Sequence, residues 1–151
     1  MTRVTFDSNI LVYAAQRADP RQEMAADLLV RAASADCVQT LQSLCECFHV
    51  LRRKRLFEAH RAQSVIDRYR QLFDVAVSSL SDLDRAIHVS AQHGLQFWDT
   101  FMWATARRAG CRVIITEDQQ DGRILEGVRF VNPFKPANGG LIDLILPPGE
   151  A

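Results

Sequence analysis

Residues 95–122 constrain the fold most, because they place a helix, a short strand and a group of acidic residues in immediate succession. Asp99 opens an apolar-rich segment that continues to Ala109, and Gly110 follows as a helix stop of the left-handed kind. Val113–Ile115 is a β-branched run too short for a helix, so it indicates a buried parallel strand. Acidic residues follow this strand directly. Ligands bind beyond the carboxyl ends of strands in open α/β sheets, so these residues are candidates for chemistry.

The rest of the chain also alternates short apolar runs with helical patterns. Helices are expected over 10–15, from Pro20 to about Ser34, over 41–51 and 58–73, and from a capping Ser81 to Gly94. Further strands are expected at Val4–Phe6, Cys37–Gln39, Asp74–Val77 and Val128–Val131. Such alternation predicts an α/β fold in which helices flank both faces of a parallel sheet. The apolar run Leu141–Leu146 predicts a small added strand or a docking segment.

The helix expected over 41–51 contains a glutamate whose place is ambiguous. Its predicted core stripe consists of Leu41, Leu44, Cys45, Phe48 and Leu51. Glu46 projects from nearly the opposite side, so periodicity assigns it to the surface, although a cleft could equally lie there. The helix closes on the basic run Arg52–Arg55, which either compensates the negative end of the helix dipole or contacts phosphate.

The composition narrows the classes of protein. With 151 residues, 48% of them hydrophobic, the chain can bury a sizeable core as one domain. The formal net charge is zero, so any affinity for nucleic acid must arise locally. No apolar run reaches the roughly 18 residues of a membrane span. The four cysteines form no CxxC pair, so we expect neither disulfide nor zinc site, and a cytoplasmic protein.

Carboxylates stand at three of the expected strand or helix ends. Asp7 follows the first strand, Asp99 begins a helix and Asp118 follows the strand at Val113–Ile115. In a parallel sheet these ends share one edge, where gathered carboxylates repel one another unless a divalent cation neutralises them. Oxygen ligands without His or Cys suit Mg²⁺ or Mn²⁺. The pattern therefore favours metal-dependent phosphoryl chemistry.

Each of these residues also has a purely structural explanation. Asp99 could cap its helix, Asp7 could form an Asx-turn, and Asp118 could belong to a turn. Trp98 and Trp103 flank Asp99, but such residues are more often core than platforms for base stacking.

A receiver-like signalling domain would also gather aspartates at strand ends. It needs a lysine after a late strand, and neither Lys54 nor Lys135 follows such a strand.

Four segments, in order, resemble the motifs of the PIN-domain nucleases, especially the VapC-type toxins of bacteria. They are VTFDSNILVY, LCECFHVLRRK, LQFWDTFMWATARRAGCRVIITED and TEDQQDG. The resemblance runs from about Val4 to Pro133. It implies a PIN-like three-layer sandwich over residues 1–135, with 136–151 as a C-terminal extension of the same domain. It also implies a Mg²⁺- or Mn²⁺-dependent endoribonuclease, a homodimer, and a small antitoxin that blocks the cleft.

The resemblance further assigns roles to individual residues. The acidic catalytic residues would be Asp7, Glu46, Asp99 and Asp118. Of these, Asp7, Asp99 and Asp118 would hold the metal, while Glu46 helps bind it or orients the attacking water. Supporting residues would be Asn9, Thr116 and Asp121, and Glu117 and Asp121 compete with Asp118 for the fourth acidic position. Candidate RNA contacts are Arg52, Arg53 and Arg55, or Arg107 and Arg108.

Two alternatives stay open within the same family. One is a nuclease of RNA processing, or one acting on DNA, without a toxin role. The other is a catalytically silent module that binds nucleic acid.

Overall fold

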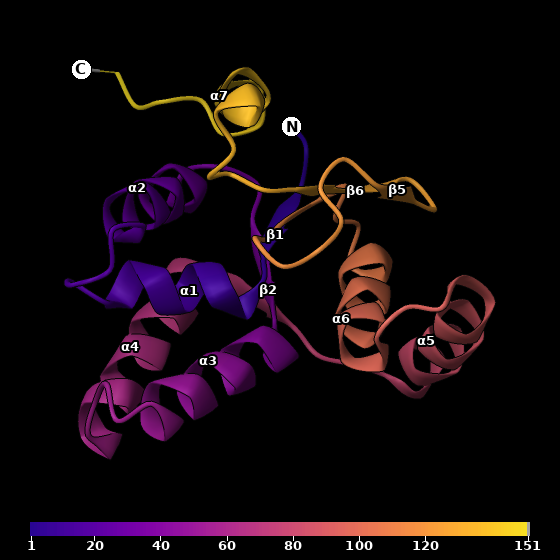
Figure 1. The fold of residues 1–151 in the computed structure, drawn as a ribbon, viewed down its shortest axis with the longest axis horizontal. Coiled ribbons are helices and arrows are strands. Elements are labelled where there is room, and N and C mark those ends of the chain that lie inside the picture. Colours follow the sequence, from indigo (N-terminus) through magenta and orange to yellow (C-terminus); the bar gives the residue numbers. More distant parts are fainter. Residues whose placement is uncertain (151) are drawn as a thin grey trace.

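The structure is a computed structural model that describes residues 1–150 (Figure 1). The strands are β1 (Val4–Phe6), β2 (Val38–Thr40), β3 (Asp74–Ala76), β4 (Val113–Ile115), β5 (Ile124–Leu125) and β6 (Val128–Val131). The helices are α1 (Ser8–Ala15), α2 (Gln22–Ala33), α3 (Leu41–Arg53), α4 (Ala59–Leu72), α5 (Leu80–His93), α6 (Phe97–Arg108) and α7 (Gly139–Ile145). A short 3-10 helix, η1 (Pro136–Asn138), precedes α7.

The central sheet has the strand order β1-β4-β6-β5. The first three strands are parallel, and β5 pairs antiparallel with β6. A smaller parallel sheet, β2-β3, joins it through a bridge between Val4 and Cys37. The sequence did not predict β5, which has two residues and depends on a tight turn with positive φ at Glu126 (46°) and Gly127 (82°). The predicted α/β fold with a mostly parallel sheet is confirmed.

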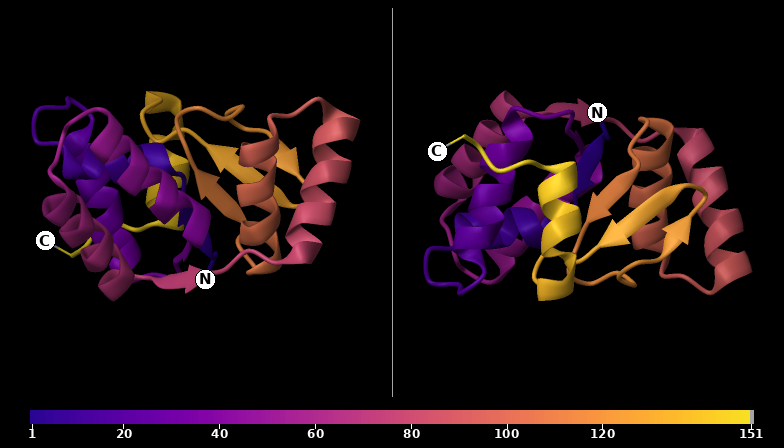
Figure 2. Two further views of the ribbon diagram at one scale, coloured as in Figure 1. Left: turned by 90° about the horizontal axis from the view of Figure 1, so that it is seen from below. Right: turned by 90° about the horizontal axis from the view of Figure 1, so that it is seen from above.

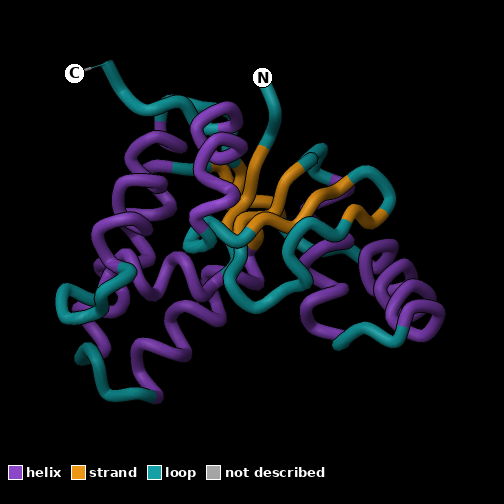
Figure 3. Tube along the Cα trace, turned by 45° about the horizontal axis from the view of Figure 1, so that its top comes forward, coloured by secondary structure: helices purple, strands orange, loops and turns teal. Residues whose placement is uncertain are grey.

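Two hydrophobic cores lie on opposite faces of the sheet. Phe6, Val113 and Ile115 pack into the core that α1 to α4 and α7 cover. Ile114, whose side chain points the other way, packs with Phe130 against α5 and α6. Figures 1 and 3 show the strands between these two groups of helices. The three-layer arrangement predicted from the sequence is therefore confirmed.

The tail beyond η1 is a helix, so the predicted strand at Leu141–Leu146 is wrong. Ile142 and Leu146 are four residues apart and both buried, which puts them on one helical face. Arg31 of α2 donates to the carbonyl of Leu146 and to Asp143. Figure 2 shows α7, in yellow, between the N-terminal helices and the sheet. The segment thus docks onto the body, while the domain boundary at residue 135 stays a prediction.

Two local expectations also need correction. Ser79, rather than Ser81, caps α5, because its side chain and that of Asp82 form a reciprocal capping box. The predicted core stripe of α3 is only partly buried, since Leu41, Cys45 and Phe48 are exposed. The buried side chains of α3 are Ser43, Leu44, Cys47 and Leu51. The helix therefore leaves an apolar stripe uncovered.

Candidate functional site

Asp7 lies where β1 ends and α1 begins. The register that pairs Phe6 with Ile115 continues one residue further, since the Asp7 amide donates to the Ile115 carbonyl at 2.9 Å. Asp7 and Thr116 consequently meet, and the Thr116 hydroxyl donates to the Asp7 carboxylate at 2.8 Å. The same carboxylate caps α1 by accepting from the Ser8 amide at 2.7 Å. Asp7 is only 6% exposed, so its carboxylate is buried at a strand end.

Thr116 ties the loop after β4 to this carboxylate. Its Oγ1 accepts from Asn9 Nδ2 at 3.3 Å and from the Asp118 amide at 3.2 Å, while its own proton goes to Asp7. The side chain thereby uses the full capacity of a hydroxyl. Asn9 in turn accepts from the Glu117 amide at 3.4 Å. The structure therefore brings the predicted supporting residues Asn9 and Thr116 against Asp7.

Glu46 is half-buried and held at both carboxylate oxygens, so the surface position that periodicity assigned to it is wrong. Ser8 Oγ donates to Oε2 at 2.9 Å, and Gln42 Nε2 donates to Oε1 at 2.7 Å. Gln42 Nε2 also reaches the Trp98 carbonyl at 2.8 Å, which links α3 to α6. The sequence reasoning missed Ser8 and Gln42. The only signals were that Ser8 follows Asp7 and that Gln42 precedes Glu46 by one helical turn.

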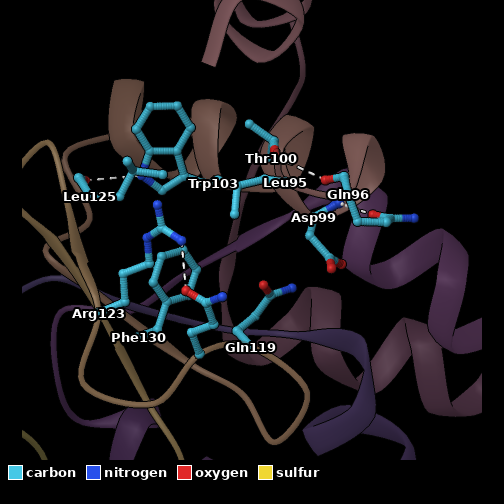
Figure 4. Close-up of a pocket in the computed structure, with 10 residues that line it drawn as sticks. Leu95, Gln96, Asp99, Thr100, Trp103, Gln119, Arg123, Leu125 and Phe130 are labelled. Carbon is cyan, nitrogen blue, oxygen red and sulfur yellow. Dashed lines mark hydrogen bonds between the residues drawn. The ribbon is translucent and has the colours of Figure 1, made fainter. Parts of the chain in front are cut away.

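Asp99 occupies the third position of α6 and does not cap that helix. The cap is Gln96, whose side-chain oxygen accepts from the Asp99 amide at 2.8 Å. The Asp99 carboxylate is thus left free of the capping role. Figure 4 shows it pointing toward Gln119, across a small recess beside α6.

The four predicted acidic residues act on one another electrostatically. Burial raises the pKa of Asp7 to about 6; the charges of Asp99 and Glu46 add to the rise, and hydrogen bonds from Thr116 and Ser8 oppose it. Burial also raises the pKa of Asp99; the neighbouring Gln119 side chain opposes the rise, and the charges of Glu46 and Asp118 add to it. None of the ion pairs within residues 1–150 gives these four carboxylates a basic partner. The cluster is an uncompensated negative site.

Of the three acidic residues in the loop after β4, Glu117 is engaged in a structural contact. Its Oε1 accepts from the Tyr13 hydroxyl at 2.9 Å and from Arg21 at 2.8 Å. Arg21 lies over the Tyr13 ring, 3.8 Å from its centroid, which fixes the group further. Glu117 therefore fastens the start of the loop to α1 and to the turn before α2.

Asp121 is engaged in a similar way at the other end of the loop. Its carboxylate accepts from the Asn132 amide at 2.8 Å and from Asn138 Nδ2 at 2.9 Å, and Lys135 lies 3.5 Å away. Asp118 lies between the two anchors, is exposed, and its carboxylate accepts no hydrogen bond from residues 1–150. The geometry thus favours Asp118 as the loop residue that is free to bind a ligand.

The donor set fits a hard divalent cation better than a soft one, because all four groups are carboxylates and Asp7 is buried without a cation. Within residues 1–150, however, no three Asp, Glu, His or Cys side chains already stand in a coordinating arrangement. A cation would have to draw the carboxylates together.

The candidate RNA-contacting arginines lie away from this cluster. Arg52, Arg53 and Arg55 are exposed at the far end of α3, where Arg53 is seven residues, or roughly 10 Å, beyond Glu46. Arg107 pairs with Glu126, and Arg108 pairs with Asp82 at 2.8 Å. Of these five residues, Arg52, Arg53 and Arg55 are the freer to meet a phosphate.

A mostly parallel three-layer sandwich with an acidic cluster at the strand ends is the class of protein that these observations define. The sequence model of a protein family described as 'PIN domain' matches residues 4–124 of this chain. The chain therefore belongs to the PIN domain family. A search of curated proteins finds no match.

Several solved structures have similar folds. A toxin–antitoxin complex from Klebsiella pneumoniae matches with 18% identity and a TM-score of 0.63, covering 87% of this chain and 98% of that one. VapC20 of Mycobacterium tuberculosis, described as a toxin that cleaves the sarcin-ricin loop, has 18% identity, a TM-score of 0.63 and coverages of 83% and 98%. VapBC2 from Rickettsia felis, bound to a fragment of promoter DNA, has 16% identity, a TM-score of 0.66 and coverages of 87% and 98%. At these identities the similarity concerns the fold.

None of the helices within residues 1–150 is long and apolar enough to cross a bilayer.

Proposed function

We propose that this protein is a Mg²⁺- or Mn²⁺-dependent endoribonuclease and the toxin of a toxin–antitoxin pair. The observation that carries the proposal is the cluster of Asp7, Glu46, Asp99 and Asp118 near the carboxyl ends of the strands. No basic side chain within residues 1–150 forms an ion pair with these four carboxylates. Membership of the PIN domain family and the shared fold with VapC structures support it.

In this proposal Asp7, Asp99 and Asp118 would hold the cation, which would supply Lewis-acid chemistry at the phosphodiester. Glu46 orients the attacking water or assists in binding the cation. Thr116 fixes the Asp7 carboxylate by donating to it. Ser8 and Gln42 each fix one oxygen of Glu46. Hydrolysis in line with the leaving oxygen would leave a 5′-phosphate and a 3′-hydroxyl.

Mapping of RNA 5′ ends tests the function directly. Wild-type protein and Asp7→Asn are expressed from an inducible promoter, and the RNA 5′ ends are sequenced. Discrete new 5′-phosphate ends that appear with wild type alone, together with growth arrest, are expected. Identical end profiles for the two proteins would refute the proposal.

The alternatives differ from it in measurable ways. A small DNA-binding protein encoded beside this gene favours the toxin role, because the similar structures include complexes of such pairs. A nuclease of RNA processing or one that cuts DNA would lack that neighbour. A silent binding module would show no carboxylate-dependent binding of Mn²⁺.

Gln42→Ala is expected to weaken Mn²⁺ binding by about tenfold, because residues that orient a metal-binding carboxylate typically contribute that much. The substitution frees Glu46 Oε1 and breaks the link to the Trp98 carbonyl. Titration calorimetry with Mn²⁺ measures the change, and Gln92→Ala, at an exposed position of α5, is the control. Unchanged Mn²⁺ affinity in Gln42→Ala would show that Glu46 does not depend on its hydrogen bond from Gln42.

We also propose that two copies pair through the uncovered stripe of α3. The exposed apolar side chains of this face are Leu41, Phe48 and Val77. This face borders a groove that Asp67 and Arg70 also line. In a two-fold contact, Asp67 of one copy could pair with Arg70 of the other, and the reverse. Sedimentation at micromolar concentration should give a dimer for wild type and a monomer for Phe48→Glu. A wild-type monomer would rule this interface out.

A further inference from the structure

The two tryptophans that flank Asp99 differ completely in burial. Trp103 is fully buried and donates from Nε1 to the Leu125 carbonyl at 3.2 Å, so it belongs to the core, as expected. Trp98, in the first turn of α6, is 57% exposed. Packing therefore accounts for one of the two residues and leaves more than half of the other in contact with water.

The position of Trp98 is nevertheless well defined. Its ring makes edge-to-face contacts with Phe97, at 5.3 Å between centroids, and with Phe101, at 6.1 Å. Its carbonyl accepts from Gln42, the residue that also holds Glu46. Trp98 thus precedes Asp99 directly in the chain, and its backbone carbonyl shares a hydrogen-bonding partner, Gln42, with Glu46. A ligand on this indole would meet a surface that is already positioned, which reduces the entropic cost of binding.

The charges around the site favour a non-ionic interaction with RNA. The net charge of the chain is zero, and the cluster itself repels phosphate until a cation is bound. Arg21 is already paired with Glu117 and Asp19. Arg123, which lines the recess with Asp99, donates to Gln120 at 2.6 Å. Stacking of a base on an aromatic ring needs no free cation and works for every base.

We propose that Trp98 is the stacking platform for an unpaired base of the RNA substrate, beside the phosphodiester that the acidic cluster cuts. This inference rests on the proposed ribonuclease function and adds the way in which the substrate is held. It requires single-stranded RNA at the site, because a paired base cannot present its face to the indole. Trp98 is a binding residue, so its loss should raise KM far more than it lowers kcat.

Tryptophan fluorescence tests the proposal directly, since the chain has two tryptophans and one is buried. An unstructured single-stranded RNA analogue whose phosphodiesters resist hydrolysis is titrated into wild type with Mg²⁺, so that the ligand is not consumed. Quenching is expected in wild type, and none is expected in Trp98→Phe, which retains only Trp103.

Binding of labelled RNA, followed by anisotropy, supplies the affinities. Trp98→Ala and Trp98→Leu should bind about tenfold more weakly, while Trp98→Phe keeps an aromatic face and most of the affinity. Trp98→Leu also keeps apolar contact with Phe97 and Phe101, so a loss of binding there is not a loss of folding; thermal unfolding checks this. Leu144→Ala, at a 79% exposed position of α7, is the control.

Three results would overturn the proposal. RNA that binds without quenching Trp98, or equal affinity in Trp98→Leu, places the RNA elsewhere. Shielding of Trp98 from acrylamide that grows with protein concentration, without RNA, assigns the indole to a protein contact. If wild type neither binds nor cuts RNA, the proposed function fails as well, whereas cleavage that is insensitive to Trp98 refutes this inference alone.

Discussion

Asp7→Asn is expected to abolish divalent-dependent RNA cleavage and, at neutral pH, to make the metal-free protein more stable than wild type. Loss of a carboxylate that holds the cation removes several kcal/mol of transition-state stabilisation, which lowers the rate by roughly a thousandfold or more. The fold should survive, because Asn caps a helix as well as Asp does and its side-chain oxygen can still accept from the Ser8 amide.

The gain in stability follows from the direction of the pKa shift. The pKa of Asp7 is raised from 3.8 to about 6 in the folded protein. The ionised form of Asp7 is therefore less favourable in the folded state than in the unfolded state, and this lowers the free energy of unfolding. Above pH 6 the cost reaches its full size, about 3 kcal/mol at most. It fades as the pH falls from 6 to 3.8 and is absent below that. Asp7→Asn should therefore raise the melting temperature by roughly 5–10 °C at pH 7.5 and hardly at all at pH 3.5.

Calorimetric unfolding with and without Mg²⁺ measures both effects. Mg²⁺ should raise the melting temperature of wild type, since it binds the folded state, and leave Asp7→Asn unchanged. Asp84→Asn, an exposed position on α5, should behave as wild type in both assays. Full cleavage by Asp7→Asn, or a melting temperature below that of wild type at pH 7.5, would contradict the role given to Asp7.

The sequence alone was sufficient for the layers of the fold and for most of its elements. Short β-branched runs such as Val113–Ile115 have no alternative to a buried strand, and the amphipathic segments between them can cover only the faces of the sheet. The elements that were predicted wrongly depend on non-local contacts. The segment after Gly140 became a helix because its apolar residues dock onto the body, and a short apolar run does not reveal that period.

The site was only partly predictable for the same reason. Asp7 and Asp99 follow from their places at element ends, but periodicity puts Glu46 on the surface. Its hydrogen bond to Ser8 joins residues 38 positions apart. The partners of Glu117 and Asp121, which leave Asp118 free, lie on α1, before α2 and after β6. No local pattern encodes such pairs.

Asp82 provides the structural counterpart to Asp7, since both are buried aspartates and their pKa values shift in opposite directions. Burial pushes the pKa of Asp82 upward, but hydrogen bonds from Arg108, the Ser79 amide and Thr105 outweigh it, so the pKa lies below its ordinary value. The Arg108 guanidinium lies 2.8 Å from Asp82, whereas no basic side chain in the described part of the chain, residues 1–150, pairs with Asp7. A buried carboxylate that the protein itself neutralises stabilises the fold, whereas one left without a basic partner is available for a ligand.

Asp82→Ala is therefore expected to destabilise the protein by about 2–4 kcal/mol, the opposite of Asp7→Asn at neutral pH. The change removes the capping box of α5, worth about 1 kcal/mol, and the buried acceptor for the Thr105 hydroxyl and Arg108. The melting temperature should fall by roughly 5–12 °C at pH 7. Because the folded pKa is lowered, wild type keeps this stabilisation above pH 3.8 and loses it as the pH falls through the folded value.

Denaturant unfolding of Asp82→Ala and of Asp84→Ala, two residues along the same helix but exposed, separates this effect from a change in helix propensity. Asp84→Ala should stay within about 0.5 kcal/mol of wild type. Below its melting temperature Asp82→Ala should still cut RNA, because the Asp82–Arg108 pair belongs to the α5–α6 contact and not to the acidic cluster. If stability is unchanged while cleavage falls, Arg108 serves the RNA and not the fold, and the distinction drawn between the two aspartates is wrong.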